Sequence, residues 1–182
     1  MTQHLLYQVD IPATEMELFE TLEYAMNHSA KQPVRGRLTN RRMIGYGKIP
    51  LMDRDYYWGD LPNFPEMPEW ALGLLDEEPE KWICLCNVYA GGDKIGTHKD
   101  TSKYMDTEAG VVSISFGMLK GALLPYDTVL GTMKVDGKNY PIKSSTPMDV
   151  PCLYTHAHSA TTHKSKCDYR INFTFRKVKS EE

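Results

Sequence analysis

His98 and Asp100 stand two positions apart at the end of the stretch CNVYAGGDKIGTHKD, and both side chains can bind a metal. A strand-like run ends at Tyr89 and a Gly-Gly turn follows. On an extended segment, residues two positions apart point to the same side. One histidine from a distant strand would complete a set of two histidines and one carboxylate, which leaves coordination positions open and suits non-haem Fe(II). The candidates for this third ligand are His156, His158 and His163.

The segment YRINFTFRK, residues 169–177, carries two arginines on one face of a predicted strand. Alternation places Arg170, Asn172, Thr174 and Arg176 on that face and Tyr169, Ile171, Phe173 and Phe175 on the other. Six residues of strand span roughly 20 Å, so two arginines leaning inward could hold both ends of a small dicarboxylate. The planar guanidinium suits bidentate binding of a carboxylate. An ordinary half-exposed strand shows the same alternation and is the alternative.

These motifs follow one another in a characteristic order. The chain reads Asn87-Val88-Tyr89, then His98-Lys99-Asp100, then Ser113-Ile114-Ser115-Phe116-Gly117, then a histidine, and then RINFTFR from Arg170. In this order the chain resembles the AlkB family of Fe(II)/2-oxoglutarate-dependent dioxygenases. The stretches LCNVYAGGDKIGTHKD and HSATTHKSKCDYRINFTFR are similar to the nucleic-acid-repair members, and the resemblance runs from about Arg41 to Lys177.

The resemblance implies a role for each matching residue. His98, Asp100 and a later histidine would hold Fe(II), the cofactor that acts with 2-oxoglutarate and O2. Arg170, helped by Tyr89, would pair with the C5 carboxylate of 2-oxoglutarate. The remaining cosubstrate residues would be Arg176, near the C1 carboxylate, and two hydrogen-bonding amides, Asn87 and Asn172.

The third metal ligand is less clearly marked than the first two. His158 is preferred, because the family places a histidine followed by small residues here and its distance to Arg170 matches the repair members. His156 precedes it on the same strand face and is the alternative, whereas His163 is expected to face solvent.

A basic and aromatic region precedes the predicted strands, and in the family this region forms a lid over a flipped base. From residue 29 to 50 the chain has six basic residues and no acid. The predicted substrate-binding residues are Arg41, Arg42, Tyr46, Tyr57, Trp58 and Ser102, with Tyr56 as a further candidate. A packed aromatic loop with solvated charges is the alternative. Ser102 replaces an acid that is common in repair members, which puts adenine or cytosine specificity in doubt. No hydrophobic finger for entering a duplex is evident, which favours a single strand.

The elements that must position these residues can also be read from the pattern. A capping box at Thr14–Glu17 predicts a helix to about His28, and a short helix is expected from about 69 to 76. Strands are expected at 82–89, 111–118, 129–135, 139–143, 149–155 and 169–177, with a hairpin turn at Asp136-Gly137. The stretch between the two helices fits loops and short strands.

A helix followed by many short strands indicates an α+β fold. We expect a double-stranded β-helix (jelly-roll) core with N-terminal helices and a nucleotide-recognition lid. The chain would be one AlkB-like domain over 1–182, with the N-terminal helix and lid in about 1–80 and the catalytic core in about 81–178.

Composition is that of a globular protein, with 182 residues, 41% hydrophobic, 25% charged and a formal net charge of -3. No apolar run is long enough to cross a membrane and no secretory signal is evident, so we expect an intracellular monomer, cytoplasmic or nuclear. Cys84, Cys86, Cys152 and Cys167 form no CxxC pair and are expected to be reduced packing residues, with metal binding by the C-x-C at 84–86 as the alternative.

The function predicted from these features is oxidative removal of alkyl groups from nucleobases of DNA or RNA, as in DNA repair or RNA demethylation. The same chemistry on a protein side chain or small molecule is the nearest alternative. A non-enzymatic nucleic-acid-binding module and a zinc hydrolase are two others, although the R-x-N-x-T-x-R strand has no role in a hydrolase.

Overall fold

The computed structural model describes residues 11, 13–34, 36–47, 65–75, 78–98, 105–150, 156–158 and 167–179, with backbone alone at 34 and 156–158. Its elements in chain order are α1 (Glu15–His28), β1 (Ala30–Val34), β2 (Arg37–Tyr46), α3 (Glu69–Leu72), a 3-10 turn (Pro79–Lys81), β3 (Trp82–Ala90), β4 (Ile95–His98), β5 (Val111–Leu119), β6 (Ala122–Leu123), β7 (Val129–Val135), β8 (Lys138–Lys143), β9 (Met148–Val150), β10 (His156–His158) and β11 (Tyr169–Lys177). No helix within these ranges is long and apolar enough to cross a membrane.

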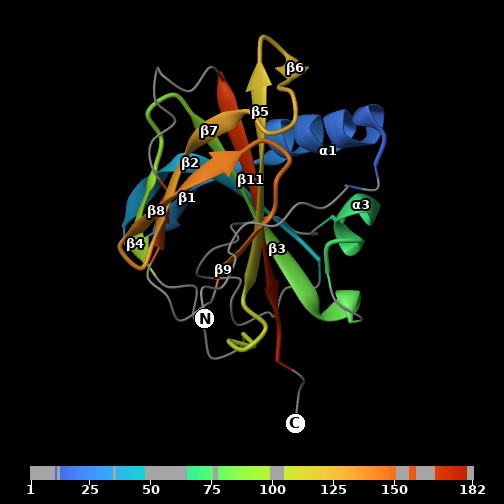
Figure 1. Cartoon of the computed structure of the whole chain (residues 1–182), viewed down its shortest axis with the longest axis vertical. Helices are drawn as coiled ribbons and strands as arrows, with labels where there is room; N and C mark the ends of the chain where they lie inside the picture. Colours follow the sequence, from blue (N-terminus) through green and yellow to red (C-terminus); the bar gives the residue numbers. More distant parts are fainter. Residues whose placement is uncertain are drawn as a thin grey trace.

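The strands of the described residues form two sheets. The larger sheet has seven strands in the order β1-β2-β3-β11-β5-β6, with β9 also paired to β5, and the smaller has four in the order β4-β10-β7-β8. Figure 1 shows α1 and α3 on one side of the larger sheet and the smaller sheet on the other. We call the side of the larger sheet under the helices its outer face and the side toward the smaller sheet its inner face. The core is therefore an antiparallel β-sandwich, in agreement with the coarse part of the predicted fold.

Helix α1 begins where the capping box predicts. The Glu17 amide donates to Thr14 Oγ1 at 3.2 Å, and the Glu17 carboxylate accepts from the Thr14 amide at 2.7 Å. Leu18, Leu22 and Ala25 form its buried stripe. They pack onto the larger sheet, so tertiary burial stabilises the helix in addition to its cap.

The outer face of the larger sheet is an apolar core. Trp70 of α3 meets Phe116 and Phe173 edge-to-face, with ring centroids 5.6 and 5.5 Å apart. Cys84 and Cys86 also lie in this cluster, and burial raises the pKa of both thiols well above the ordinary value. They are packing residues there, as predicted, because the C-x-C spacing sends both side chains to the outer face.

The two sheets are joined by a second apolar cluster and by the chain around Ser144. The cluster consists of Val111, Leu130, Met133, Val135, Ile142, Met148 and Val150. The Ser145 amide donates to the Ser115 carbonyl at 2.8 Å, and the Gly117 amide donates to Ser144 Oγ at 3.3 Å. A Cβ on Gly117 would lie 2.5 Å from Leu130 Cδ2 and 2.8 Å from Leu124 Cδ1, so a larger residue there would require these leucine side chains to shift.

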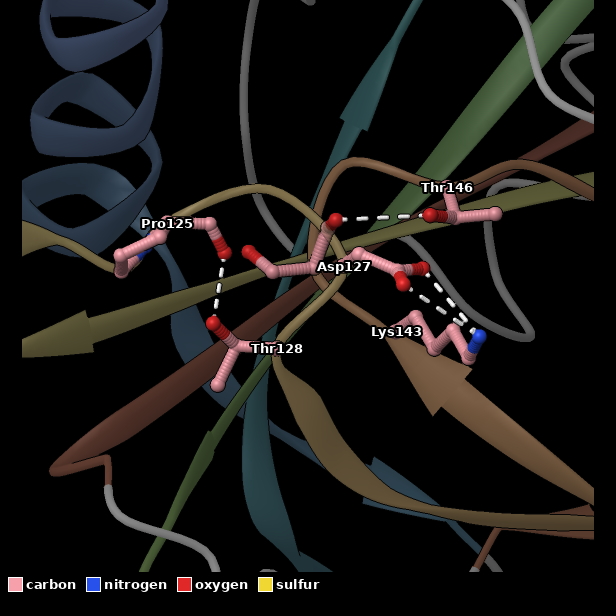
Figure 2. Close-up of polar contacts among 6 residues, drawn as sticks. Pro125, Asp127, Thr128, Lys143 and Thr146 are labelled. Carbon is pink, nitrogen blue, oxygen red and sulfur yellow. Dashed lines mark hydrogen bonds and ion pairs between the residues drawn. The ribbon is translucent and has the colours of Figure 1, made fainter.

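Polar contacts join the turn between β6 and β7 to residues 143–146, at and just after the end of β8 (Figure 2). Thr128 Oγ1 donates to the Pro125 carbonyl at 2.7 Å, and the Asp127 amide donates to the Ser144 carbonyl at 3.0 Å. Lys143 Nζ lies 3.2 Å from Asp127 Oδ1, an exposed ion pair of the kind worth at most about 1 kcal/mol. The backbone hydrogen bonds therefore define this turn more than the ion pair does.

Most predicted strands agree closely with the structure. The strand predicted at 129–135 is β7, the strand at 169–177 is β11, and Asp136-Gly137 forms the predicted hairpin turn, with φ of +46° and +81°. The predicted helix at 69–76 is shorter, because α3 ends at Leu72 with Gly73 as its C-cap. Residues 149 and 150 of the strand predicted at 149–155 belong to β9 (Met148–Val150). Residues 151–155 lie outside the described residues.

The largest difference lies in the segment expected to hold loops and short strands. There the chain forms the hairpin β1–β2, and the second half of β2 pairs with β3 from Arg42↔Val88 to Tyr46↔Cys84. Pairing with β3 buries Met43–Tyr46, a gain that local composition does not reveal. The described part of the first 80 residues therefore supplies two strands to the larger sheet as well as the helices α1 and α3.

Candidate functional site

The inner face of the larger sheet is polar along its middle strand. Strand β11 lies between β3 and β5, and Arg170 stands opposite Tyr89 on one side and Gly117 on the other. Two positions further on, Asn172 stands opposite Asn87 and Ser115. The four predicted cosubstrate residues Asn87, Tyr89, Arg170 and Asn172 are therefore brought together from two strands, and all four are buried.

Arg170 is the most unusual residue of this face, because its side chain is fully buried. Its Cζ lies 4.0 Å from the ring centroid of Tyr89, in a cation–π arrangement. Burial lowers the pKa of the Arg170 guanidinium, and Tyr89 and Cys167 partly oppose that shift. A buried cation is costly, so an anionic ligand bound to Arg170 would offset a free-energy cost already present in the fold.

Asn172 is the centre of a buried hydrogen-bond network. Its Nδ2 donates to Ser113 Oγ at 2.8 Å and to Ser115 Oγ at 3.1 Å, and its Oδ1 accepts from Thr174 Oγ1 at 2.8 Å. The amide thus has partners on both ends, and its position on the inner face is fixed. Within the described residues, Asn172 shapes the floor of the site through this network.

Asn87 is held from the neighbouring strand. Arg41 Nε of β2 donates to Asn87 Oδ1 at 2.6 Å, and Asn87 is 4% exposed. Arg41 was predicted to contact the substrate and Asn87 the cosubstrate, and the structure joins the two residues directly.

Arg176 stands at the far end of the same strand face, opposite Ile83 and Val111. It is half-buried, in contrast to Arg170. Six residues of strand place the two Cα atoms roughly 20 Å apart, and the Asn172 network lies between them. The spacing fits two arginines that approach one small dianion from opposite ends.

His98 ends β4 of the smaller sheet. Its Nδ1 lies 2.7 Å from the Gly96 carbonyl, which can only accept, so Nδ1 is the donor of this contact and in the neutral ring Nε2 would be the atom with a lone pair for a metal. In the backbone register His156 stands directly opposite His98, and His158 stands opposite Ile95 after an irregularity. Two of the three candidates for the third ligand, His156 and His158, therefore belong to the strand beside His98.

The predicted metal ligands lie partly outside the described residues. Asp100 and His163 fall outside them, and His156 and His158 are described by their backbone alone. Within the described part of the chain, no three His, Cys, Asp or Glu side chains form a group that could hold a metal.

The predicted substrate residues are divided between the two faces of the sheet. Arg42 lies on the outer face, where its Nη1 donates to the Met26 carbonyl of α1 at 2.7 Å. Tyr46 is 2% exposed in the outer core, its ring centroid 5.9 Å from that of Phe173, and burial raises its pKa. Among the described candidates, Arg41 alone stands on the inner face. Tyr56, Tyr57, Trp58 and Ser102 lie outside the described residues.

Three buried hydroxyls of the inner face were not among the predicted site residues, namely Ser113, Ser115 and Thr174. The alternation Ser-x-Ser-x-Gly in β5 was the available signal. It indicated a polar face, but only the register with β11 shows that this face meets Asn172.

Comparison with known proteins gives a likeness of fold. No protein-family model matches the sequence, and no curated protein matches it. A Pseudomonas putida prolyl-4-hydroxylase is similar in structure with a TM-score of 0.57 and 10% identity, over 98% of this chain and 95% of that one. A Burkholderia pseudomallei oxidoreductase of the 2OG-Fe(II) oxygenase family has a TM-score of 0.47 and 14% identity, over 95% of this chain and 84% of that one. This chain has the fold of the prolyl-4-hydroxylase, and at 10% identity the likeness establishes the fold alone.

Proposed function

We propose that this chain is an Fe(II)/2-oxoglutarate-dependent dioxygenase that removes alkyl groups from nucleobases. The observation that carries the proposal is Arg170, a fully buried guanidinium 4.0 Å from the Tyr89 ring centroid, on the central strand β11 of a polar inner face. The fold shared with a prolyl-4-hydroxylase supports the dioxygenase part of the proposal, and the AlkB-like order of motifs supports the nucleobase part.

The residues of the inner face fit a dicarboxylate. Arg170 would bind the C5 carboxylate through its planar fork, with the Tyr89 ring keeping that fork in one orientation. Asn87 would donate from Nδ2, since Arg41 occupies its Oδ1. Arg176 would approach the C1 carboxylate from the other end of the strand, and the Asn172 network would exclude water beneath the cosubstrate.

The metal would be held by His98 through Nε2, by Asp100 and by His158, with His156 as the alternative. The Gly96 carbonyl keeps the His98 ring in the tautomer that can bind a metal. When bound, Fe(II) with O2 and 2-oxoglutarate supplies the oxidation of the N-alkyl carbon, and the products are succinate, CO2 and an aldehyde.

The proposed substrate is alkylated DNA or RNA, with a single strand favoured. The hairpin β1–β2 presents Lys31 and Arg37 to solvent, and Arg37 lies beside Leu38, which is 66% exposed. Basic side chains on an exposed hairpin can contact phosphates, a contribution that falls as salt increases. The same oxidation of a protein side chain is the second candidate, and the fold shared with a prolyl-4-hydroxylase favours it.

The deciding experiment incubates the protein with Fe(II), 2-oxoglutarate and O2 together with methylated oligonucleotides, single- and double-stranded, or with a peptide library. Succinate and the substrate products are measured by mass spectrometry. We expect succinate formation that is stimulated by a methylated single strand, with loss of the methyl group. Succinate stimulated only by peptides would replace the nucleobase by a protein side chain. No succinate under any condition would overturn the dioxygenase proposal.

A pair of variants decides the third ligand. His158→Ala is expected to be inactive and His156→Ala to be only impaired, because the H-S-A context and the spacing to Arg170 favour His158. The reverse result would assign the ligand to His156, which the register places opposite His98.

A further inference from the structure

We propose that Arg41 is a positioning residue that fixes the orientation of the Asn87 amide toward the ligand. The inference rests on the proposed function, because the ligand in question is 2-oxoglutarate. Its basis is the hydrogen bond of 2.6 Å from Arg41 Nε to Asn87 Oδ1, between residues 46 positions apart in the sequence. This bond connects β2, from the basic segment of the chain, to a residue of the predicted cosubstrate site.

The chemistry of the two groups makes this bond directional. A guanidinium has only donors, whereas a carboxamide has an accepting oxygen on one side and a donating NH2 on the other. Arg41 therefore selects the amide rotamer in which Oδ1 faces β2 and Nδ2 is the atom left for a ligand. A ligand beside Nδ2 must accept hydrogen bonds, as a carboxylate or keto oxygen does. With the amide reversed, Oδ1 would face the same ligand and repel it.

Arg41 is itself braced by the β1–β2 hairpin. Thr39 Oγ1 donates to the Arg41 carbonyl at 2.7 Å and accepts from the Gln32 amide at 3.0 Å. This contact lies at the register shift of the hairpin between Lys31 and Pro33. The Arg41 carbonyl is thus held by Thr39, which is itself bonded to Gln32 of β1. The Arg41 side chain is held by its bond to Asn87.

The neighbouring residue Arg42 shows that positive charge alone does not explain why the Arg41 side chain contacts Asn87. Arg42 points to the outer face and donates to the Met26 carbonyl. Adjacent arginines of equal charge therefore have different partners, one on the helix and one in the site.

The test measures the dissociation constant of 2-oxoglutarate by calorimetry, on protein loaded with Mn(II) so that no turnover occurs. Arg41→Met keeps the apolar stem and removes every donor, and we expect affinity to fall on the order of tenfold, the usual effect of losing a charged hydrogen bond. Asn87→Ala should lose at least as much. Adding Arg41→Met to Asn87→Ala should cause no further loss, because Arg41 acts through Asn87. Lys138→Met, which removes one positive charge at an exposed residue of β8, should bind like wild type.

Arg41→Lys provides a second cycle that does not depend on the methionine variant folding. Lysine keeps the charge but has a methylene where arginine has Nε, so we expect a several-fold loss of affinity that is again absent in the Asn87→Ala background. Wild-type affinity in the single Arg41 variants, or additive losses in the double variants, would overturn the role of Arg41 alone. A wild-type protein that does not bind 2-oxoglutarate would overturn the proposed function instead.

Discussion

The two faces of strand β11 are equally buried and chemically opposite. Phe173 on the outer face and Arg170 on the inner face are both 0% exposed. Around Phe173 lie aromatic rings and two buried thiols, whereas Arg170 lies on Tyr89 near a network of amide and hydroxyl groups. The degree of burial therefore does not distinguish an apolar core from a candidate site. The polarity of the buried side chains distinguishes them.

The two faces of β11 are also expected to differ in how much they contribute to the stability of the fold. Burial of a large apolar side chain stabilises a fold by about 1.5–3 kcal/mol, and the outer face holds several such side chains. Burial of a guanidinium costs free energy unless it is compensated. We therefore expect the outer face to contribute more to the stability of the fold than the inner face does.

The sharpest test of the proposed site is His98→Ala, in the smaller sheet that faces the inner face. We expect no measurable turnover of 2-oxoglutarate, because an open-sided ligand set cannot lose a histidine and still hold Fe(II) productively. The thermal unfolding midpoint should stay near that of wild type, since His98 lies at a strand end. His28→Ala, at the exposed end of α1, is the matched control and should keep full activity. Turnover in His98→Ala above a small fraction of wild type contradicts the assignment.

The complementary change on the outer face is Phe173→Ala. It removes a ring that packs against Trp70 and Phe116, so we expect the free energy of unfolding to fall by about 3–5 kcal/mol. Denaturant unfolding measures this loss. Under conditions where the variant is folded, its affinity for 2-oxoglutarate should match wild type. A folded variant with weakened binding would mean that the two faces are not independent.

Arg170→Lys tests the guanidinium while keeping a positive charge. We expect the KM for 2-oxoglutarate to rise by about tenfold or more, because a point charge cannot replace the bidentate fork or its stacking on Tyr89. Steady-state kinetics with varied 2-oxoglutarate measure this, and Lys138→Arg, a charge-conserving change at an exposed residue of β8, is the control. An unchanged KM would place the carboxylate elsewhere.

The smallest expected effect concerns the cap of α1, far from the inner face. Thr14→Ala should lower the free energy of unfolding by about 1 kcal/mol and leave 2-oxoglutarate turnover unchanged. Hydrogen bonds from Thr14 lower the pKa of Glu17. A lowered pKa in the folded state means that the contribution of Glu17 is present above its unfolded pKa and is lost as pH falls through the folded value. Thermal unfolding of wild type and Glu17→Gln should therefore differ at neutral pH and converge in acid, and a constant difference would contradict this.

Much of the local structure follows from the sequence alone. The alternation in residues 169–177 determines which side chains share a face of β11, because neighbouring strand residues must point to opposite sides. The capping box determines where α1 begins, and Asp136-Gly137 determines the turn between β7 and β8, because both depend on a few adjacent residues. These same patterns indicated that Arg170 and Asn172 lie together.

The partners of these residues were decided only by the tertiary structure. Arg41 and Arg42 look alike in the sequence, yet one holds Asn87 and the other holds the end of α1. Asn172 donates a hydrogen bond to Ser113, 59 positions away in the sequence. His98 lies opposite His156, its neighbour on the adjacent strand of the smaller sheet. Periodicity within a strand is a local property, whereas the register between strands depends on pairing and burial over long separations. For this reason the sequence could propose candidate residues for the site but could not give their contacts.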